Sequence, residues 1–177
     1  MLDNERIREA EGNIKSYLQE GLLKKTPTNQ QIMNIFLTNG KESLRVAEEV
    51  HNQNLSDLWV IVCSYYAMYY YANAALLKYC LKVGDKIVHK VTSDALIVYV
   101  RRKLKESLIE EYEEMKEEAM NLAGIKADEL IETFDYERHK RSLIQYKTIE
   151  KDKHTKAATS LQRAKVFTKE IEKLIIA

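Results

Sequence analysis

Residues 58–77 read LWVIVCSYYAMYYYANAALL, a run of twenty positions without a charged residue. A helix of this length and apolarity could cross a membrane. Five tyrosines, Ser64 and Asn73 lie in the middle of the run, however, and tyrosine prefers the membrane interface to the hydrocarbon centre. A helix that is apolar on all sides is also typical of the centre of a water-soluble bundle. We therefore predict that this segment is the central helix of a bundle and that the protein has no membrane partner.

The composition of the whole chain favours helices as well. Its 177 residues include one proline and five glycines, with 45% hydrophobic residues, 31% charged residues and a net charge of +1. So few turn-forming residues argue against a β-sandwich or β-barrel, which needs a turn roughly every 8–12 residues. The apolar share argues against a disordered chain. We expect an all-α protein that folds as one compact unit.

Apolar residues recur at helical spacing along most of the chain, and no segment of convincing length shows the alternation typical of a strand. This pattern predicts helices over about residues 4–24, 27–52, 55–83, 90–122, 127–146 and 157–175. Thr26 or Thr28 is the expected N-cap of the second helix. Asn39-Gly40 could interrupt that helix, and Gly84 is expected to end the third.

The N-terminal sequence MLDNERIREAEG has no apolar core, so it predicts no secretory signal. Cys63 and Cys80 lie 17 positions apart in one predicted helix. That spacing separates them by about 25 Å and prevents a disulfide between them. Two buried free thiols are typical of a reducing compartment. We therefore expect a cytoplasmic protein.

Charge is distributed unevenly along the chain. From Arg138 to the C-terminus there are eleven Lys or Arg and four Asp or Glu, a net charge of +7. The preceding residues carry a net charge of −6, with seven glutamates between Glu106 and Glu118. The two regions could be solvated helix faces that pair with each other. Alternatively, the C-terminal part could be a basic surface for a partner that carries phosphates.

Motifs for nucleotide or metal binding are missing: the sequence has no P-loop, no GxGxxG, no HExxH and no cysteine–histidine zinc spacing. Glu48 and His51 form one Glu-x-x-His motif, but a di-iron bundle requires this motif from two helices. None of the other histidines has a glutamate three positions before it. We expect neither a bound metal nor a cofactor.

A segment near the C-terminus combines basic and aromatic side chains. They are Tyr136, Arg138, His139, Lys140, Arg141, Tyr146 and Lys147. Guanidinium groups bind phosphate through two parallel hydrogen bonds, and phenol rings can stack on unpaired bases. The segment therefore predicts a contact with RNA or a nucleotide, although a basic helix face exposed to solvent has the same composition.

Residues 64–100 resemble the signature helix pair of the HEPN-domain family. In many members the first helix reads roughly Ser-Tyr-Tyr-Ala-Met-Phe and continues into Ala-Leu-Leu, and a histidine opens the next helix after a glycine-bearing turn. The matching residues here are SYYAM at 64–68, AALL at 74–77, Gly84 and His89. Residues 141–146 resemble the family's late Arg-to-Tyr segment, and LQRAKVFTKEIEKLI at 161–175 resembles its final helix. The resemblance covers about residues 41–177.

The resemblance implies an antiparallel bundle of four or five helices that pairs into a homodimer. It divides the chain into an N-terminal helical extension over residues 1–38 and a HEPN-like bundle over residues 39–177. Many HEPN proteins are metal-independent ribonucleases, and some are toxins whose partner is a small nucleotidyltransferase. Their site is an arginine followed after four to six residues by a histidine, with both subunits contributing.

Arg141 corresponds to the family's arginine, and Tyr146 stands where the histidine is expected. Arginine offsets negative charge on the phosphate, and histidine removes a proton near neutral pH. A phenol of pKa about 10 is ionised only to roughly 0.1% at pH 7 and is a much poorer base. Tyr70 and Asn73 also replace polar residues, often histidine and arginine, of relatives. The resemblance therefore implies a degenerate catalytic motif.

These observations predict a homodimer that binds RNA or a nucleotide in a basic cleft. Arg141 and Tyr146 occupy the catalytic positions, and the expected ligand-binding residues are Arg138, Lys140, Lys147, Asn73 and Tyr70. One alternative is a toxin-like ribonuclease in which Arg141 holds the phosphate and His139 or His89 supplies the base. A further alternative is an interaction partner of a small nucleotidyltransferase.

Overall fold

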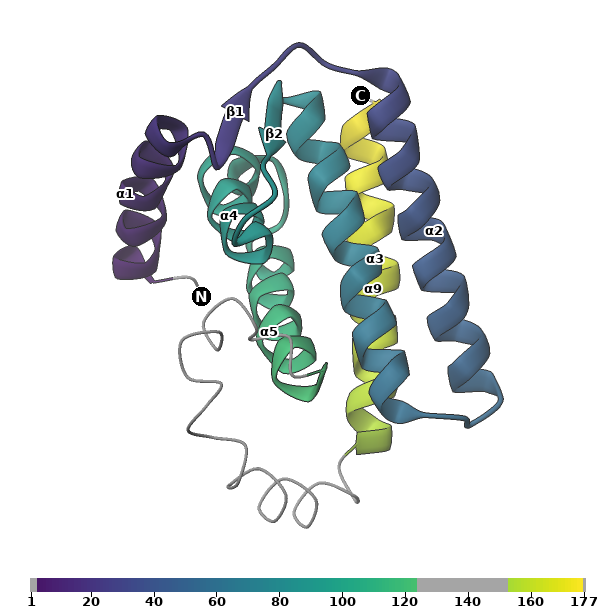
Figure 1. The fold of residues 1–177 in the computed structure, drawn as a ribbon. Coiled ribbons are helices and arrows are strands. Elements are labelled where there is room, and N and C mark those ends of the chain that lie inside the picture. The colour runs from purple at the N-terminus through teal and green to yellow at the C-terminus, as the bar shows by residue number, and fades with distance from the viewer. Residues whose placement is uncertain (1–2, 124–152, 177) are drawn as a thin grey trace, which may run out of the picture.

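The computed structural model describes residues 3–123 and 153–176, and it is mostly helical (Figure 1). The helices are α1 (Asn4–Glu20), α2 (Gln30–Asn52), α3 (Asp57–Lys78), α4 (Val88–Ala95), α5 (Glu106–Ala123) and α9 (Lys153–Ile176). Two short strands, β1 (Leu23–Lys25) and β2 (Leu81–Val83), form an antiparallel ribbon. The predicted all-α class is confirmed, and the helix predicted over residues 127–146 lies outside the described residues.

Helix α3, which carries no charged residue from Leu58 to Leu77, lies at the centre of the bundle, as its composition predicts. It packs against α2, α5 and α9, and every residue from Val60 to Leu77 is buried or half-buried. Ser56 caps the helix, since its side chain accepts a hydrogen bond from the backbone nitrogen of Trp59. Within the part of the chain that the structure describes, no helix is long and apolar enough to cross a membrane.

The helices around α3 do not all run antiparallel to it. His154 Nδ1 lies 3.0 Å from Asp57 Oδ1 at the beginning of α9 and α3, and Lys78 Nζ donates to the Ile175 carbonyl at their ends. α9 therefore runs parallel to α3, whereas α2 and α5 run antiparallel to both (Figure 1). Successive long helices therefore alternate in direction, as in an up-down-up-down bundle, and the HEPN type of bundle that the resemblance implies stays a prediction. The direction alternates because α5 returns the chain to the end of the bundle where α3 begins, and α9 starts there.

Gly40 lies in the middle of an uninterrupted α2, so Asn39-Gly40 does not break this helix. A Cβ atom at residue 40 would lie 2.6 Å from the ring of Tyr71 and 3.4 Å from the carbonyl oxygen of Ala67. The Tyr71 ring is held in place, because its hydroxyl donates a hydrogen bond to Glu172 Oε1 at 2.6 Å. The missing side chain therefore allows α2 and α3 to approach closely.

We expect Gly40→Ala to destabilise the protein by about 1–3 kcal/mol, because overpacking against Tyr71 outweighs a gain in helix propensity of about 1 kcal/mol. Gly12→Ala is the matched control: Gly12 also lies within a helix, and nothing lies within 4 Å of the added Cβ. This change should stabilise the protein by up to about 1 kcal/mol. Urea unfolding measures both, and an equal effect of the two would contradict the close approach of α2 and α3.

A two-stranded ribbon joins the end of α1 to the end of α3, and the prediction contained no strand. α1 ends at Gly21 (φ 75°), and α3 ends at Tyr79, which is followed by Cys80 with a φ of 60°. Gly84, expected to end the third helix, instead closes the ribbon by donating its amide to the Leu22 carbonyl at 2.8 Å. Strands of three residues are too short to show an alternating pattern in the sequence.

The prediction of one continuous helix over residues 90–122 is wrong in the middle of that range. α4 is followed by a π-helical turn (Leu96–Val100) and a 3-10 turn (Arg101–Lys103), and Leu104 is extended before α5 begins. The interruption allows α4 to pack against α1 while α5 packs against α3. Neither proline nor glycine occurs between His89 and Glu106, so no local signal marks it.

Smaller differences concern a helix cap and the two thiols. Asn29, rather than Thr26 or Thr28, caps α2, because its side-chain oxygen accepts a hydrogen bond from the backbone nitrogen of Ile32. Cys63 is half-buried, but Cys80 is exposed and lies beyond the end of α3. The expectation of two buried thiols in one helix is therefore wrong for Cys80.

The predicted domain boundary at residue 38 falls inside α2.

Candidate functional site

Six of the predicted site residues lie outside the described residues. They are Arg138, His139, Lys140, Arg141, Tyr146 and Lys147. Tyr70, Asn73 and His89 are described. Asn73 of α3 contacts Thr92 of α4, and His89 of α4 lies against Tyr69 of α3. Tyr70 lies beside Tyr69 and contacts Phe36 of α2. A cleft that combines both groups stays a prediction, and the candidate site is built here from the second group.

Tyr65, Tyr66, Tyr69 and Tyr70 of α3 gather beside His89, which lies in the first turn of α4; we call these five residues the tyrosine–histidine cluster. Their spacing along α3 places the four phenols on one side of the helix. His89 Nδ1 lies 2.7 Å from the Tyr65 hydroxyl oxygen. The centroid of the His89 ring lies 4.7 Å from that of Tyr69 and 6.0 Å from that of Tyr66. The cluster is a partly exposed aromatic wall along α3.

Burial raises the pKa of three phenols of the cluster, those of Tyr65, Tyr66 and Tyr69. The pKa of Tyr69 rises to about 12, with a further contribution from the neighbouring Tyr70 and Tyr66. Burial also raises the pKa of Tyr65 well above its usual value. These tyrosines are therefore uncharged at neutral pH, so none of them is a base there.

Tyr70 and Asn73, the two described residues predicted to bind a ligand, lie in different environments. Tyr70 is half-buried, and its ring centroid lies 6.3 Å from that of Phe36 on α2. Asn73 is buried, and its amide nitrogen donates to the Tyr69 carbonyl at 2.9 Å and to Thr92 Oγ1 at 3.3 Å. Asn73 therefore joins α3 to α4, while Tyr70 leaves part of its ring open to a ligand.

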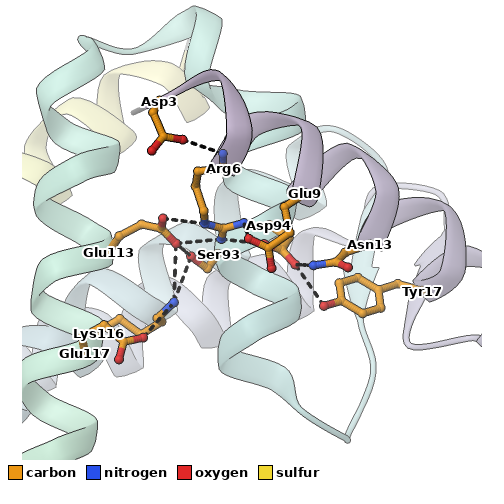
Figure 2. A network of polar contacts seen from close by, with 10 residues as sticks. All are labelled: Asp3, Arg6, Glu9, Asn13, Tyr17, Ser93, Asp94, Glu113, Lys116 and Glu117. Carbon is orange, nitrogen blue, oxygen red and sulfur yellow. Dashed lines mark hydrogen bonds and ion pairs between the residues drawn. The ribbon is translucent and has the colours of Figure 1, made fainter. Parts of the chain in front are cut away.

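A second polar cluster, which we call the Arg6 network, lies between α1, α4 and α5 (Figure 2). The Arg6 guanidinium donates two hydrogen bonds of 2.9 Å to Glu113 and one of 2.6 Å to Asp94 Oδ1. Asp94 is fully buried, and its Oδ2 accepts hydrogen bonds from Asn13 at 3.0 Å and from Tyr17 at 2.9 Å. Three side chains of α1 thus converge on one carboxylate of α4.

Glu113 is ionised at neutral pH within this network. Burial alone would raise its pKa, but hydrogen bonds from Arg6 and Ser93 lower the pKa below its usual value. Lys116 adds a second cation, with its Nζ 3.4 Å from Glu113 Oε1. The pairing of cations with carboxylates leaves little charge to attract an anion, so the Arg6 network serves to hold α1 against the bundle.

A pocket of about 720 Å³ opens beside the Arg6 network, between α1, α5 and α9. Its lining includes four Lys or Arg side chains and four glutamates. Arg6 and Lys116, two of the four cations, already pair with Glu113. This balance gives a phosphate no net attraction, so the pocket does not suit the predicted RNA or nucleotide ligand.

None of the residues of the Arg6 network is among the predicted site residues, although the sequence contains one signal for the network. Asp94 is the sole acidic residue between Asp85 and Glu106, and it interrupts the apolar run VTSDALIVYV at 91–100. A carboxylate in a buried helix requires hydrogen-bond or cationic partners. Its cation, Arg6, is 88 positions away in the sequence, and helical periodicity does not reveal pairs at such a distance.

The described ranges hold no group of three or more His, Cys, Asp or Glu side chains arranged to bind a metal ion. His51 of the single Glu-x-x-His motif stacks on His154, with ring centroids 5.5 Å apart. His154 in turn pairs with Asp57 at the start of α3. These side chains join α2, α3 and α9 at one end of the bundle.

Comparison of the chain with protein-family models, with curated proteins and with solved structures finds no match. Membership of the HEPN family therefore stays a prediction from the resemblance of residues 41–177.

Proposed function

We propose that this protein is a HEPN-like homodimer that binds single-stranded RNA or a nucleotide through the tyrosine–histidine cluster and the cations around Arg141. The observation that carries the proposal is the aromatic wall on α3, where the half-buried rings of Tyr66 and Tyr69 lie within 6.0 Å of the His89 ring. Stacking of a base on an aromatic side chain is worth about 1–3 kcal/mol. A helical bundle is also the fold expected for this family.

In this proposal, different residues stack on the bases and bind the phosphates. Tyr70, with its half-buried ring, supplies a stacking surface, and the neighbouring Tyr69 is neutral because burial raises the pKa of its phenol. The phosphates are bound by the basic side chains of the predicted cleft, which are Arg138, Lys140, Arg141 and Lys147. Tyr146 is a poor base, so binding without cleavage is the expected activity.

RNA binding of the full chain tests this proposal. In a fluorescence-anisotropy titration, Tyr70→Ala should weaken the affinity for a single-stranded oligonucleotide about 5- to 150-fold, because it removes a stacking ring. Arg141→Ala should weaken affinity and also reduce its dependence on salt between about 50 and 200 mM, because it removes a phosphate contact.

Tyr79→Ala is the matched control for the stacking residue. Tyr79 is also half-buried, but it lies just past the end of α3, away from the cluster. This variant should bind RNA as the wild type does. An affinity that does not respond to salt, or that Tyr79→Ala and Tyr70→Ala reduce equally, would contradict the proposed binding surface.

One contact favours ribonuclease activity as a second candidate function. The Tyr65 hydroxyl lies 2.7 Å from His89 Nδ1 and so restrains the orientation of the imidazole ring. An oriented imidazole can remove a proton from an attacking 2′-hydroxyl near neutral pH, and Arg141 would offset the charge that builds on the phosphate. His139 is the alternative base.

Incubation of single-stranded RNA with the protein in EDTA separates the two functions. Cleavage that rises with protein concentration and is lost in Arg141→Ala supports the ribonuclease, whereas binding without cleavage supports the binding protein. Tyr65→Phe keeps the ring but removes the hydrogen bond to His89. It should slow cleavage on the order of 10-fold if His89 is the base and leave the rate unchanged if His139 is.

A further inference from the structure

Helix α2 carries two uncharged stripes, and this chain covers the first of them. Met33, Gly40 and Ala47 recur every seven residues and are buried. The second stripe lies beside the first, and all of its residues are exposed or half-buried. They are Ile32, Phe36, Asn39, Ser43, Val46 and Val50, at intervals of four and three residues. A helix at the side of a bundle needs one apolar stripe to pack, so the second is left for a partner.

Helix α3 continues this uncharged surface. Its outward residues are Trp59, Cys63, Tyr66 and Tyr70, again at intervals of four, three and four. Trp59 is 56% exposed. The Phe36 and Tyr70 rings lie 6.3 Å apart, so the stripes of the two helices adjoin. We call the second stripe of α2 and these four residues of α3 the α2–α3 face.

None of the residues of the α2–α3 face is charged, although 31% of the residues of the whole chain are charged. The charged side chains of α2 lie elsewhere on the helix: Glu48 pairs with Lys165 of α9 at 2.8 Å, and Glu42 lies at the rim of the face. Val46 and Val50 are each two positions from Glu48, about 160–200° around the helix, so the face lies on the side of α2 away from α9. An exposed apolar surface of this kind marks an interaction site.

We infer that the α2–α3 face binds a second copy of this chain, so that α2 and α3 of two protomers pack around a two-fold axis. This inference rests on the homodimer of the proposed function. The two helices have 23 and 22 residues, which makes each roughly 33 Å long, and two packed helices are about 20 Å wide. Such a face approaches the area of about 800 Å² per partner that a stable dimer buries.

The absence of charge favours a second copy over nucleic acid as the occupant. In a two-fold arrangement the same patch meets itself, and an uncharged patch brings no like charges together. A phosphate backbone would meet no cation among the residues of this face. Tyr66 and Tyr70 belong both to the face and to the tyrosine–histidine cluster. Tyr69 and His89 are also half-buried but belong to the cluster alone, so this part of the cluster lies outside the proposed interface.

Sedimentation velocity of the full chain tests the inference. Val46→Glu and Trp59→Glu each place a carboxylate on the face, at positions that are 44% and 56% exposed and therefore tolerate the change. Because the two-fold axis introduces each change twice, each should raise the dimer dissociation constant at least about 100-fold. Val166→Glu is the matched control: Val166 is 41% exposed but lies on α9, so the constant should not change.

Each outcome of this experiment decides a different question. A wild-type dimer that Val46→Glu and Trp59→Glu dissociate, and that Val166→Glu leaves intact, supports the interface. A dimer that stays intact in both face variants overturns the interface but leaves the homodimer standing. A wild-type monomer at micromolar concentration overturns both, and the RNA titration then tests ligand binding by itself. Far-UV circular dichroism checks folding, and Val46→Glu decides alone if Trp59→Glu does not fold.

Discussion

Arg6→Ala should lower the free energy of unfolding by about 3 kcal/mol, because it leaves the carboxylates of the Arg6 network without their shared cation. The Asp94 side chain is fully buried, and the Arg6 side chain is 22% exposed. Removal of one partner from a buried ion pair costs about 3–5 kcal/mol, and the partial exposure of Arg6 places the expected loss at the lower end. Urea unfolding followed by far-UV circular dichroism measures it.

Arg8→Ala is the control for this prediction, because Arg8 is an exposed arginine on the same helix. It should change the free energy of unfolding by no more than about 0.5 kcal/mol. If Arg6→Ala is as stable as Arg8→Ala, the apolar side of α1 (Ala10, Ile14 and Tyr17) suffices to hold this helix. The Arg6 network would then have no measurable part in the docking of α1.

Phe167→Ala has the second large expected effect, a destabilisation of about 4 kcal/mol. Phe167 is fully buried on α9, and its ring stacks on that of Tyr112 of α5 with centroids 5.5 Å apart. Truncation of a buried phenylalanine loses the transfer free energy of the ring and leaves a cavity, which together cost about 3–5 kcal/mol. The midpoint of urea unfolding should fall with little change in its slope, because the unfolded surface is nearly the same.

Val166→Ala tests the neighbouring position on the same helix. Val166 is exposed, so the loss of two methyl groups should cost less than about 1 kcal/mol. The contrast between adjacent residues depends on which side of α9 faces the bundle. Similar effects of the two variants would show that α9 is rotated from the orientation described here.

The position of α3 could be predicted from the sequence because its composition leaves one physical solution. A helix without charge for twenty residues has no side that prefers water, so it must be covered by other helices or by lipid. The tyrosines in its middle favoured the first, and the structure buries the helix among α2, α5 and α9. The all-α class followed in the same way from the single proline and five glycines.

The candidate site was predictable only in part. The resemblance singled out Tyr70, Asn73 and His89, and the structure places Asn73 against Thr92 of α4, His89 against Tyr69 of α3, and Tyr70 beside Phe36 of α2. The contacts between α3 and α4 were not predictable, because the direction in which α4 passes α3 depends on a turn at Gly84 that belongs to the ribbon. The break between α4 and α5 was missed for a similar reason, since it results from packing on two different helices and not from a local signal.

The sequence by itself determined that the chain is helical, which of its helices is central, and that this helix carries no charge over twenty residues. Tertiary structure decided which part of that helix the chain covers and which part stays open beside α2. It also paired Arg6 with Asp94 across 88 positions. The physical reason is that periodicity records which side of a helix avoids water, whereas the partner that covers this side is set by packing between segments far apart in the chain.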